Sequence, residues 1–245
     1  MNRNSLSKLI LSLGFLILVS SSTFGQFIES GKIVYERKTN LLKLKELPPF
    51  LKDIAENKKY NIDEFTLTFN EHGSVFIPKT AMSNDPADML TTKNTVYCNH
   101  QTKDRMTLLD MMGNKVYIQD TVNKINWKMT DNTRKLAGYN CKMAIYQKDD
   151  STRLYAWYAE ELVPSVGPET FSGLPGTILG LATEDGGVVY FAKSVEFVTV
   201  EDKAFKYETG KTKVFTKKAF AEEITKQMGN SPMAKGMIAS FFKWY

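Results

Sequence analysis

The feature that most constrains this chain is a succession of short stretches in which apolar and polar residues alternate, broken by turn residues about every ten positions. In residues 65–70, for example, Phe65, Leu67 and Phe69 alternate with threonines. Alternation of this kind is typical of a half-buried antiparallel strand. The regular spacing favours a meander or an open barrel over a fold in which strands and helices alternate.

Most of the chain is accordingly predicted as β-strand. The predicted strands cover residues 31–39, 65–70, 74–78, 94–100, 105–111, 115–120, 124–129, 141–148, 152–159, 176–183 and 187–200. Turn residues at 70–73, 149–151 and 186–187 predict that the strands on either side of each form a hairpin.

Two segments are predicted as helices, a short one near residues 50–59 and one near 217–229. The second begins after Thr216, a residue type that caps helices, and stops at Gly229. We therefore expect a mainly β (α+β) fold, an antiparallel meander curling into an open or half barrel, in a single domain over residues 26–245.

The first 25 residues have the pattern of a secretory signal peptide. Arg3 and Lys8 precede an apolar stretch that ends in small residues, which predicts cleavage between Gly25 and Gln26. An uncleaved N-terminal anchor is the alternative. No later stretch is long and apolar enough for a transmembrane helix, so we expect an exported protein of the periplasm or extracellular space.

Charge and composition exclude several classes of protein. Hydrophobic residues make up 42% and charged residues 24% of the chain, so it is not disordered throughout. The formal charge of +5 falls to +3 without residues 1–25, which contain two basic and no acidic residues. Because the lysines are spread out, we do not expect a nucleic-acid partner.

No established catalytic motif is present. The chain lacks G-x-S-x-G, H-E-x-x-H, a P-loop and G-x-G-x-x-G. Its two histidines, His72 and His100, lie in or beside predicted turns, and two Cys with two His exclude a multi-cysteine zinc module. We therefore assign no catalytic, cofactor-binding or metal-binding residue.

The two cysteines, Cys98 and Cys141, both lie on strand faces that can point inward. In an oxidising compartment they can form a disulfide, worth about 4 kcal/mol through loop closure. This pairing requires their strands to be neighbours. The alternative is two buried free thiols that pack as small hydrophobic groups.

The most distinctive stretch is GPETFSGLPGTILGL, residues 167–181. Leu174 precedes a proline and is therefore extended. Pro175 and Gly176 fit the two corners of a type II turn, where the glycine supplies positive φ, and Gly173 permits close packing. On the residues alone, this is a rigid turn that leads into a core strand.

The same stretch resembles the signature of the GLPGLI family. Trp127, Gly138 to Cys141, Trp157-Tyr158 and Gly167-Pro168 resemble further conserved segments of that family. Gly180 is a departure, since the family more often has an acid there. The resemblance implies an exported protein of Bacteroidetes-type bacteria, with a fold similar to the half barrels of periplasmic lipoprotein carriers. It implies no chemistry, because the family has no settled activity.

Three functions remain open. The leading hypothesis is a non-enzymatic envelope protein that binds an apolar or peptide-like ligand, or a partner protein, on a curved sheet. The second is a hydrolase that uses Ser172 or Thr170 near the turn with His72 or His100, and it requires a hydrogen bond between hydroxyl and imidazole. The third is a structural accessory of a surface or transport complex.

Overall fold

The structure is a computed structural model of the chain, and it describes residues 29–44, 47, 49–80, 85–111, 114–150 and 152–242. The predicted signal peptide and its cleavage site lie outside these residues. Within the described part, no helix has both the length and the apolar character needed to cross a bilayer.

The described strands form one twelve-stranded sheet, which confirms the mainly β prediction. Across the sheet the order is β12-β6-β5-β4-β3-β2-β1-β11-β10-β9-β8-β7. Neighbours are antiparallel except β12, which is parallel to β6. The strands are β1 (Gly31–Asn40), β2 (Tyr60–Phe69), β3 (Gly73–Pro78), β4 (Thr95–Asn99), β5 (Asp104–Met111), β6 (Asn114–Thr121), β7 (Lys128–Leu136), β8 (Tyr139–Asp149), β9 (Thr152–Ala159), β10 (Thr177–Thr183), β11 (Val188–Glu196) and β12 (Val214–Thr216).

The sheet consists of two meanders, β1 to β6 and β7 to β11, and the pairing of β1 with β11 joins them. The chain must therefore pass from β6, next to one edge of the sheet, to β7 at the other. Residues 122–127 make this connection. They reach at most about 25 Å.

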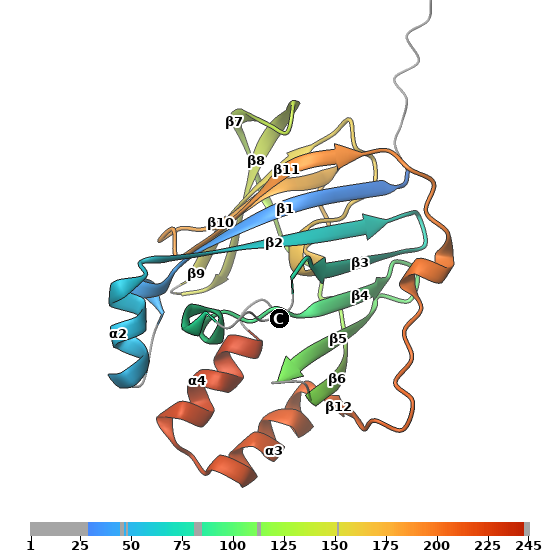
Figure 1. The fold of residues 1–245 in the computed structure, drawn as a ribbon. Helices are drawn as coiled ribbons and strands as arrows, with labels where there is room; N and C mark the ends of the chain where they lie inside the picture. The colour runs from blue at the N-terminus through green and yellow to red at the C-terminus, as the bar shows by residue number, and fades with distance from the viewer. Residues whose placement is uncertain are drawn as a thin grey trace, which may run out of the picture.

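That short connection requires the sheet to curl. Ten inter-strand steps separate β6 from β7, which would span about 48 Å in a flat sheet. Because residues 122–127 reach about half that distance, the two ends of the sheet must approach each other. Figure 1 shows the result, a curled and open sheet with β7 and β8 at one end and β6 and β12 at the other.

The inner face of the curled sheet is filled by the chain itself. Ile33, Tyr35 and Arg37 of β1 are buried on this face, while their neighbours along the strand are more exposed. The connection from β9 to β10, residues 160–176, packs into the concavity. It contributes four buried apolar side chains to the main core, those of Leu162, Val166, Phe171 and Leu174.

Three α-helices lie in the described part of the chain, α2 (Pro49–Asn57), α3 (Lys217–Met228) and α4 (Pro232–Phe241), besides short 3-10 helices such as Pro86–Leu90. The Thr216 hydroxyl accepts a hydrogen bond from the N–H of Ala219, which confirms the predicted cap of α3, and Gly229 ends this helix. Helices α3 and α4 form a separate core with β5 and β6, built on Leu109, Ile118, Phe220, Ile224, Ala234 and Phe242.

Some predicted boundaries are wrong. The strand predicted at 124–129 begins only at Lys128, because residues 122–127 are the connection between the sheet edges. The strand predicted to reach residue 200 ends at Glu196, where the chain leaves the sheet. Strand β12 and helix α4 were not predicted, since each depends on contacts with distant elements.

Cys98 and Cys141 are both buried and both free. They lie on β4 and β8, which are separated in the sheet by β3, β2, β1, β11, β10 and β9. The strands are not neighbours, so the structure agrees with the free-thiol alternative. Burial raises the pKa of Cys98, and it raises the pKa of Cys141 to about 11.

The purified protein should therefore contain two free thiols. Alkylation under denaturing conditions without reductant, followed by mass measurement, counts them, and an unmodified Cys98–Cys141 pair would contradict the structure. The Cys141 thiol has a pKa of about 9 when unfolded and about 11 when folded. Stability to denaturant should thus fall as pH rises from about 9 to 11, and less in Cys141→Ala.

Candidate functional site

The turn from Gly173 to Gly176 ends the loop that fills the sheet. Gly173 has a φ of +91° and Gly176 a φ of +144°, values that favour glycine. The N–H of Gly176 donates to the carbonyl of Leu174 (2.8 Å), which centres a three-residue turn on Pro175. The hydrogen bond expected of the predicted type II turn is absent, because Thr177 donates instead to Leu162 (2.9 Å).

The residues just before this turn are held by side chains from other parts of the chain. The Trp127 indole, at the end of the connection between the sheet edges, donates to the carbonyl of Ser172 (2.9 Å). The N–H of Gly173 donates to the hydroxyl of Ser165 (2.7 Å). Ser172 therefore contributes its backbone, and its neighbour Phe171 is buried beside Trp127, with ring centroids 6.3 Å apart.

Glu169 and Thr170 carry the most unusual backbone in this loop. Their φ values are +52° and +69°, and both residues are buried. Non-glycine residues in this region cost about 1–3 kcal/mol each and persist where their surroundings fix them, often at functional sites. The contacts of these two side chains show what fixes them.

Glu169 is held by a buried network inside the sheet. Its Oε1 accepts a hydrogen bond from the Tyr190 hydroxyl (2.8 Å) and lies 4.0 Å from Arg37 Nη1. Arg37 in turn donates to Asp63 Oδ2 through Nη2 (2.7 Å) and Nε (3.2 Å). The guanidinium also stacks on Phe65, 4.7 Å from the ring centroid.

The network continues towards the short helix at Pro86–Leu90. Lys93 Nζ lies 3.3 Å from Asp63 Oδ1 and 2.8 Å from Asp88 Oδ2. Asn61 donates to both Asp88 (3.2 Å) and Thr91 (3.0 Å). All five charged side chains of the network, those of Arg37, Asp63, Asp88, Lys93 and Glu169, are at most 7% exposed.

The protonation states follow from this environment. Burial opposes the charge on Arg37, yet the acidic groups around it, Asp63 and Glu169 among them, raise its pKa above the ordinary value. Burial, and then the nearby charge of Glu169, raise the pKa of Tyr190 well above its ordinary value. Tyr190 is thus a neutral phenol that donates its proton to a carboxylate.

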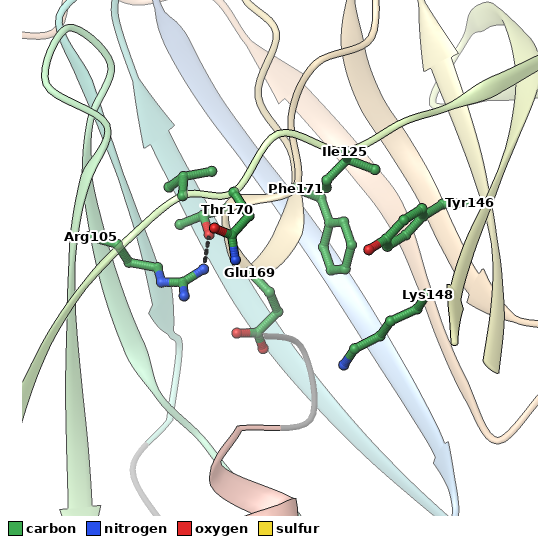
Figure 2. A pocket seen from close by; sticks show the side chains of 9 residues that line it. Arg105, Ile125, Tyr146, Lys148, Glu169, Thr170 and Phe171 are labelled. Carbon is green, nitrogen blue, oxygen red and sulfur yellow. Dashed lines mark hydrogen bonds between the residues drawn. The ribbon is translucent and has the colours of Figure 1, made fainter. Parts of the chain in front are cut away.

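A pocket of about 60 Å³ opens beside Glu169 and Thr170. Figure 2 shows Arg105 on one side of it and Tyr146 and Lys148 on the other, with Phe171 between. Residues of the connection between the sheet edges complete the lining. The pocket therefore lies at the gap of the open sheet, between β5 and β8.

The pocket lining is polar and carries both signs of charge. Arg105 donates to the Thr170 hydroxyl (3.4 Å) and to Asp120 Oδ2 (2.7 Å). Burial, and then the positive charge of Lys217, lower the pKa of Lys148. Two cationic side chains, a hydroxyl, the Glu169 carboxylate and an aromatic wall can together hold a small polar group.

The imidazoles lie outside the sheet strands, His72 just before β3 and His100 just after β4. His72 Nδ1 is 3.1 Å from Asp202 Oδ1, and His100 Nε2 is 3.1 Å from the hydroxyl of Ser74. In the described part of the chain, neither ring hydrogen-bonds Thr170 or Ser172, the contact that the predicted hydrolase requires. Burial lowers the pKa of His100, and Ser74 beside it is buried.

Among the described residues, no group of three or more His, Cys, Asp or Glu side chains could hold a metal ion.

The sequence predicted the position of the GLPG turn, but it did not predict the charged network or the pocket. One signal was available: Arg37 shares a strand face with Ile33 and Tyr35. An arginine at an inward position predicts a buried partner of opposite charge.

Comparisons with known proteins bear on the fold. No protein-family model and no curated protein matches the chain. Two crystal forms of PNGF-II resemble it with TM-scores of 0.54 and 0.55 at 18% identity, over 82% of this chain and 33% and 34% of theirs. An uncharacterised conserved protein from Thermus thermophilus has a TM-score of 0.42 at 6% identity, over 76% of this chain and 90% of its own. The chain thus spans about a third of the length of PNGF-II, and the likeness shows a shared fold.

Replacing Gly176 by alanine should destabilise the protein by about 3 kcal/mol or more, because the new Cβ would overlap the Ala159 carbonyl oxygen at a strained φ. Gly210 is the matched control, with positive φ (+54°) but nothing within 4 Å of a Cβ, and Gly210→Ala should cost about 1 kcal/mol. Urea unfolding measures both, and equal losses would show that the close approach is unimportant.

Arg37→Met should destabilise the protein by about 3–5 kcal/mol, because it removes the buried cation beside Glu169 and leaves Asp63 paired with Lys93 alone. Arg153→Met is the control, since it breaks an exposed pair with Glu184 at 2.8 Å, and it should change stability little. Similar midpoints of chemical unfolding for the two variants would contradict the prediction that the buried charged network stabilises the fold.

Proposed function

We propose that this chain is an exported, non-enzymatic binding module of the GLPGLI type, and that it holds the end group of a peptide-like ligand in the pocket beside Thr170. The observation that carries the proposal is the pocket itself. It opens where two buried non-glycine residues, Glu169 and Thr170, are held in a left-handed conformation. Strain of this kind is a reason to look for function at the same residues.

The size of the pocket distinguishes between the ligands that the sequence left open. Sites for whole drug-sized ligands measure about 300–1,000 Å³. A pocket of about 60 Å³ holds a few atoms, such as a carboxylate or a short side chain. An acyl chain would need the inner face of the sheet, which residues 160–176 already cover. A peptide-like ligand that inserts one end is therefore the better fit.

The chemistry of the lining supports the same choice. Peptides combine charged ends, amides and side chains, and the pocket offers two cations, a hydroxyl and the rings of Tyr146 and Phe171. Export is supported by residues 1–25, whose sequence has the signal-peptide pattern. The similarity to PNGF-II supports the fold and adds no ligand.

Binding can be tested with a mixture of tripeptides that have free ends. Equilibrium dialysis against the purified protein, with mass spectrometry of the retained peptides, gives the bound fraction of each. Lys148→Gln should weaken binding of the retained peptides about tenfold, because it removes a charge-assisted contact. Lys115→Gln, at an exposed position of β6 away from the pocket, should not.

Two results would contradict the proposal. One is that no tripeptide is retained by the unmodified protein at millimolar concentration. The other is that Lys148→Gln and Lys115→Gln retain the same peptides equally, which would place any binding outside the pocket.

A further inference from the structure

We infer that the pocket selects an uncharged group of its ligand, and that a side-chain carboxamide of a peptide is the group it takes. The inference rests on the proposed function and adds the chemical group that is recognised. It follows from two observations. The charges around the pocket are paired within the protein, and the lining mixes hydrogen-bond donors with acceptors.

Arg105 and Glu169 both line the pocket, and both are paired with groups of opposite charge. Arg105 Nη2 lies 2.7 Å from Asp120 Oδ2. Glu169 Oε1 accepts a hydrogen bond from the Tyr190 hydroxyl (2.8 Å) and lies 4.0 Å from Arg37 Nη1. An ion that entered the pocket would compete with these existing partners. Its loss of hydration would therefore not be compensated by a charge of opposite sign held ready for it.

Lys148, on the opposite side of the pocket (Figure 2), is subject to a similar balance. Burial and the positive charge of Lys217 lower its pKa, and the negative charge of Asp149 raises it. The two neighbouring charges thus act on Lys148 in opposite directions. Lys148 can still donate a hydrogen bond to a neutral carbonyl oxygen, which keeps the contact that the proposed function assigns to it.

The lining offers both donors and acceptors of hydrogen bonds. Arg105 and Lys148 only donate, the Glu169 carboxylate only accepts, and the Thr170 hydroxyl and the Asn123 amide do both. A ligand carboxylate only accepts and an ammonium only donates, so each would also face groups of its own kind. A carboxamide has an acceptor oxygen and a donor NH₂ group without net charge. It therefore matches a mixed lining whose charges are paired.

The size and the apolar part of the lining fit the same group. A pocket of about 60 Å³ holds a few atoms, and Val122, Ile125, Tyr146 and Phe171 line the rest of it. Their apolar surfaces can cover the methylene groups that carry the amide, while the polar groups fix its orientation. The end group that the pocket holds is then the end of a side chain, and the charged termini of the peptide remain in solvent.

The experiment compares tripeptides with free ends in equilibrium dialysis at neutral pH. All have glycine at both ends, and the central residue is asparagine, aspartate, glutamine, glutamate or leucine. We expect at least one of the two amides to be retained about tenfold more than its acid and than the leucine peptide. The acid would bring an ionised group into the pocket, and leucine would leave the polar lining without a partner.

Asp120→Asn tests whether the paired charges cause this selection. It removes the acidic partner of Arg105, so the preference for the amide over the acid should fall about threefold. Asparagine can keep the oxygen that accepts from the N–H of Thr121 (2.7 Å), and the fold should be retained. Asp131→Asn, at an exposed position of β7, is the control and should keep the full preference. An unchanged preference in Asp120→Asn would contradict the inference.

The same measurements separate this inference from the proposed function. Equal retention of amides, acids and the leucine peptide would show that the pocket takes a terminus common to all of them. Higher retention of the acids would show that it takes an anion. In both cases this inference is wrong while peptide binding stands. If no tripeptide is retained at millimolar concentration, the proposed function fails and this inference fails with it.

Discussion

The interaction on which the rest of the structure depends is the buried contact of Arg37 with Asp63 and, through Tyr190, with Glu169. Three of these residues belong to adjacent strands, β2, β1 and β11, and so they lie where the two meanders meet. Glu169 comes from the loop that fills the concavity. Arg37 thus links the junction of the two meanders to the loop that occupies the concave face of the sheet. A buried cation that lost these carboxylates would be costly, which makes the position of the loop specific.

The sequence predicted the local structure well, because local structure follows from local patterns. The alternation in residues 65–70 predicted the end of β2, and Thr216 and Gly229 predicted both ends of α3. The sequence did not predict that β1 pairs with β11 or that β12 joins β6, because these contacts link segments far apart in the chain. The length of the connection at 122–127 sets the curl of the sheet. It could be evaluated only once the strand order was known.

The site was only partly predictable for the same reason. The sequence indicated a turn at Gly173 to Gly176, and the structure places it next to the pocket. It gave no sign that Arg105 and Lys148, on strands towards opposite ends of the sheet, would line one pocket. Gly180 likewise depends on a distant strand, because a Cβ there would lie 2.8 Å from a methyl group of Leu136 on β7.

The filled interior has a consequence for recognition. A curled sheet with an empty apolar interior can enclose a long apolar ligand, and its affinity then follows buried area. Here residues 160–176 occupy that interior. The apolar surface that a ligand could cover is already covered by the protein's own Leu162, Phe171 and Leu174. For the proposed ligand, the loop leaves the polar gap at which the two ends of the sheet approach each other. A site of that kind discriminates through charge and hydrogen bonds, because few ligand atoms are buried and each unmatched polar group is costly.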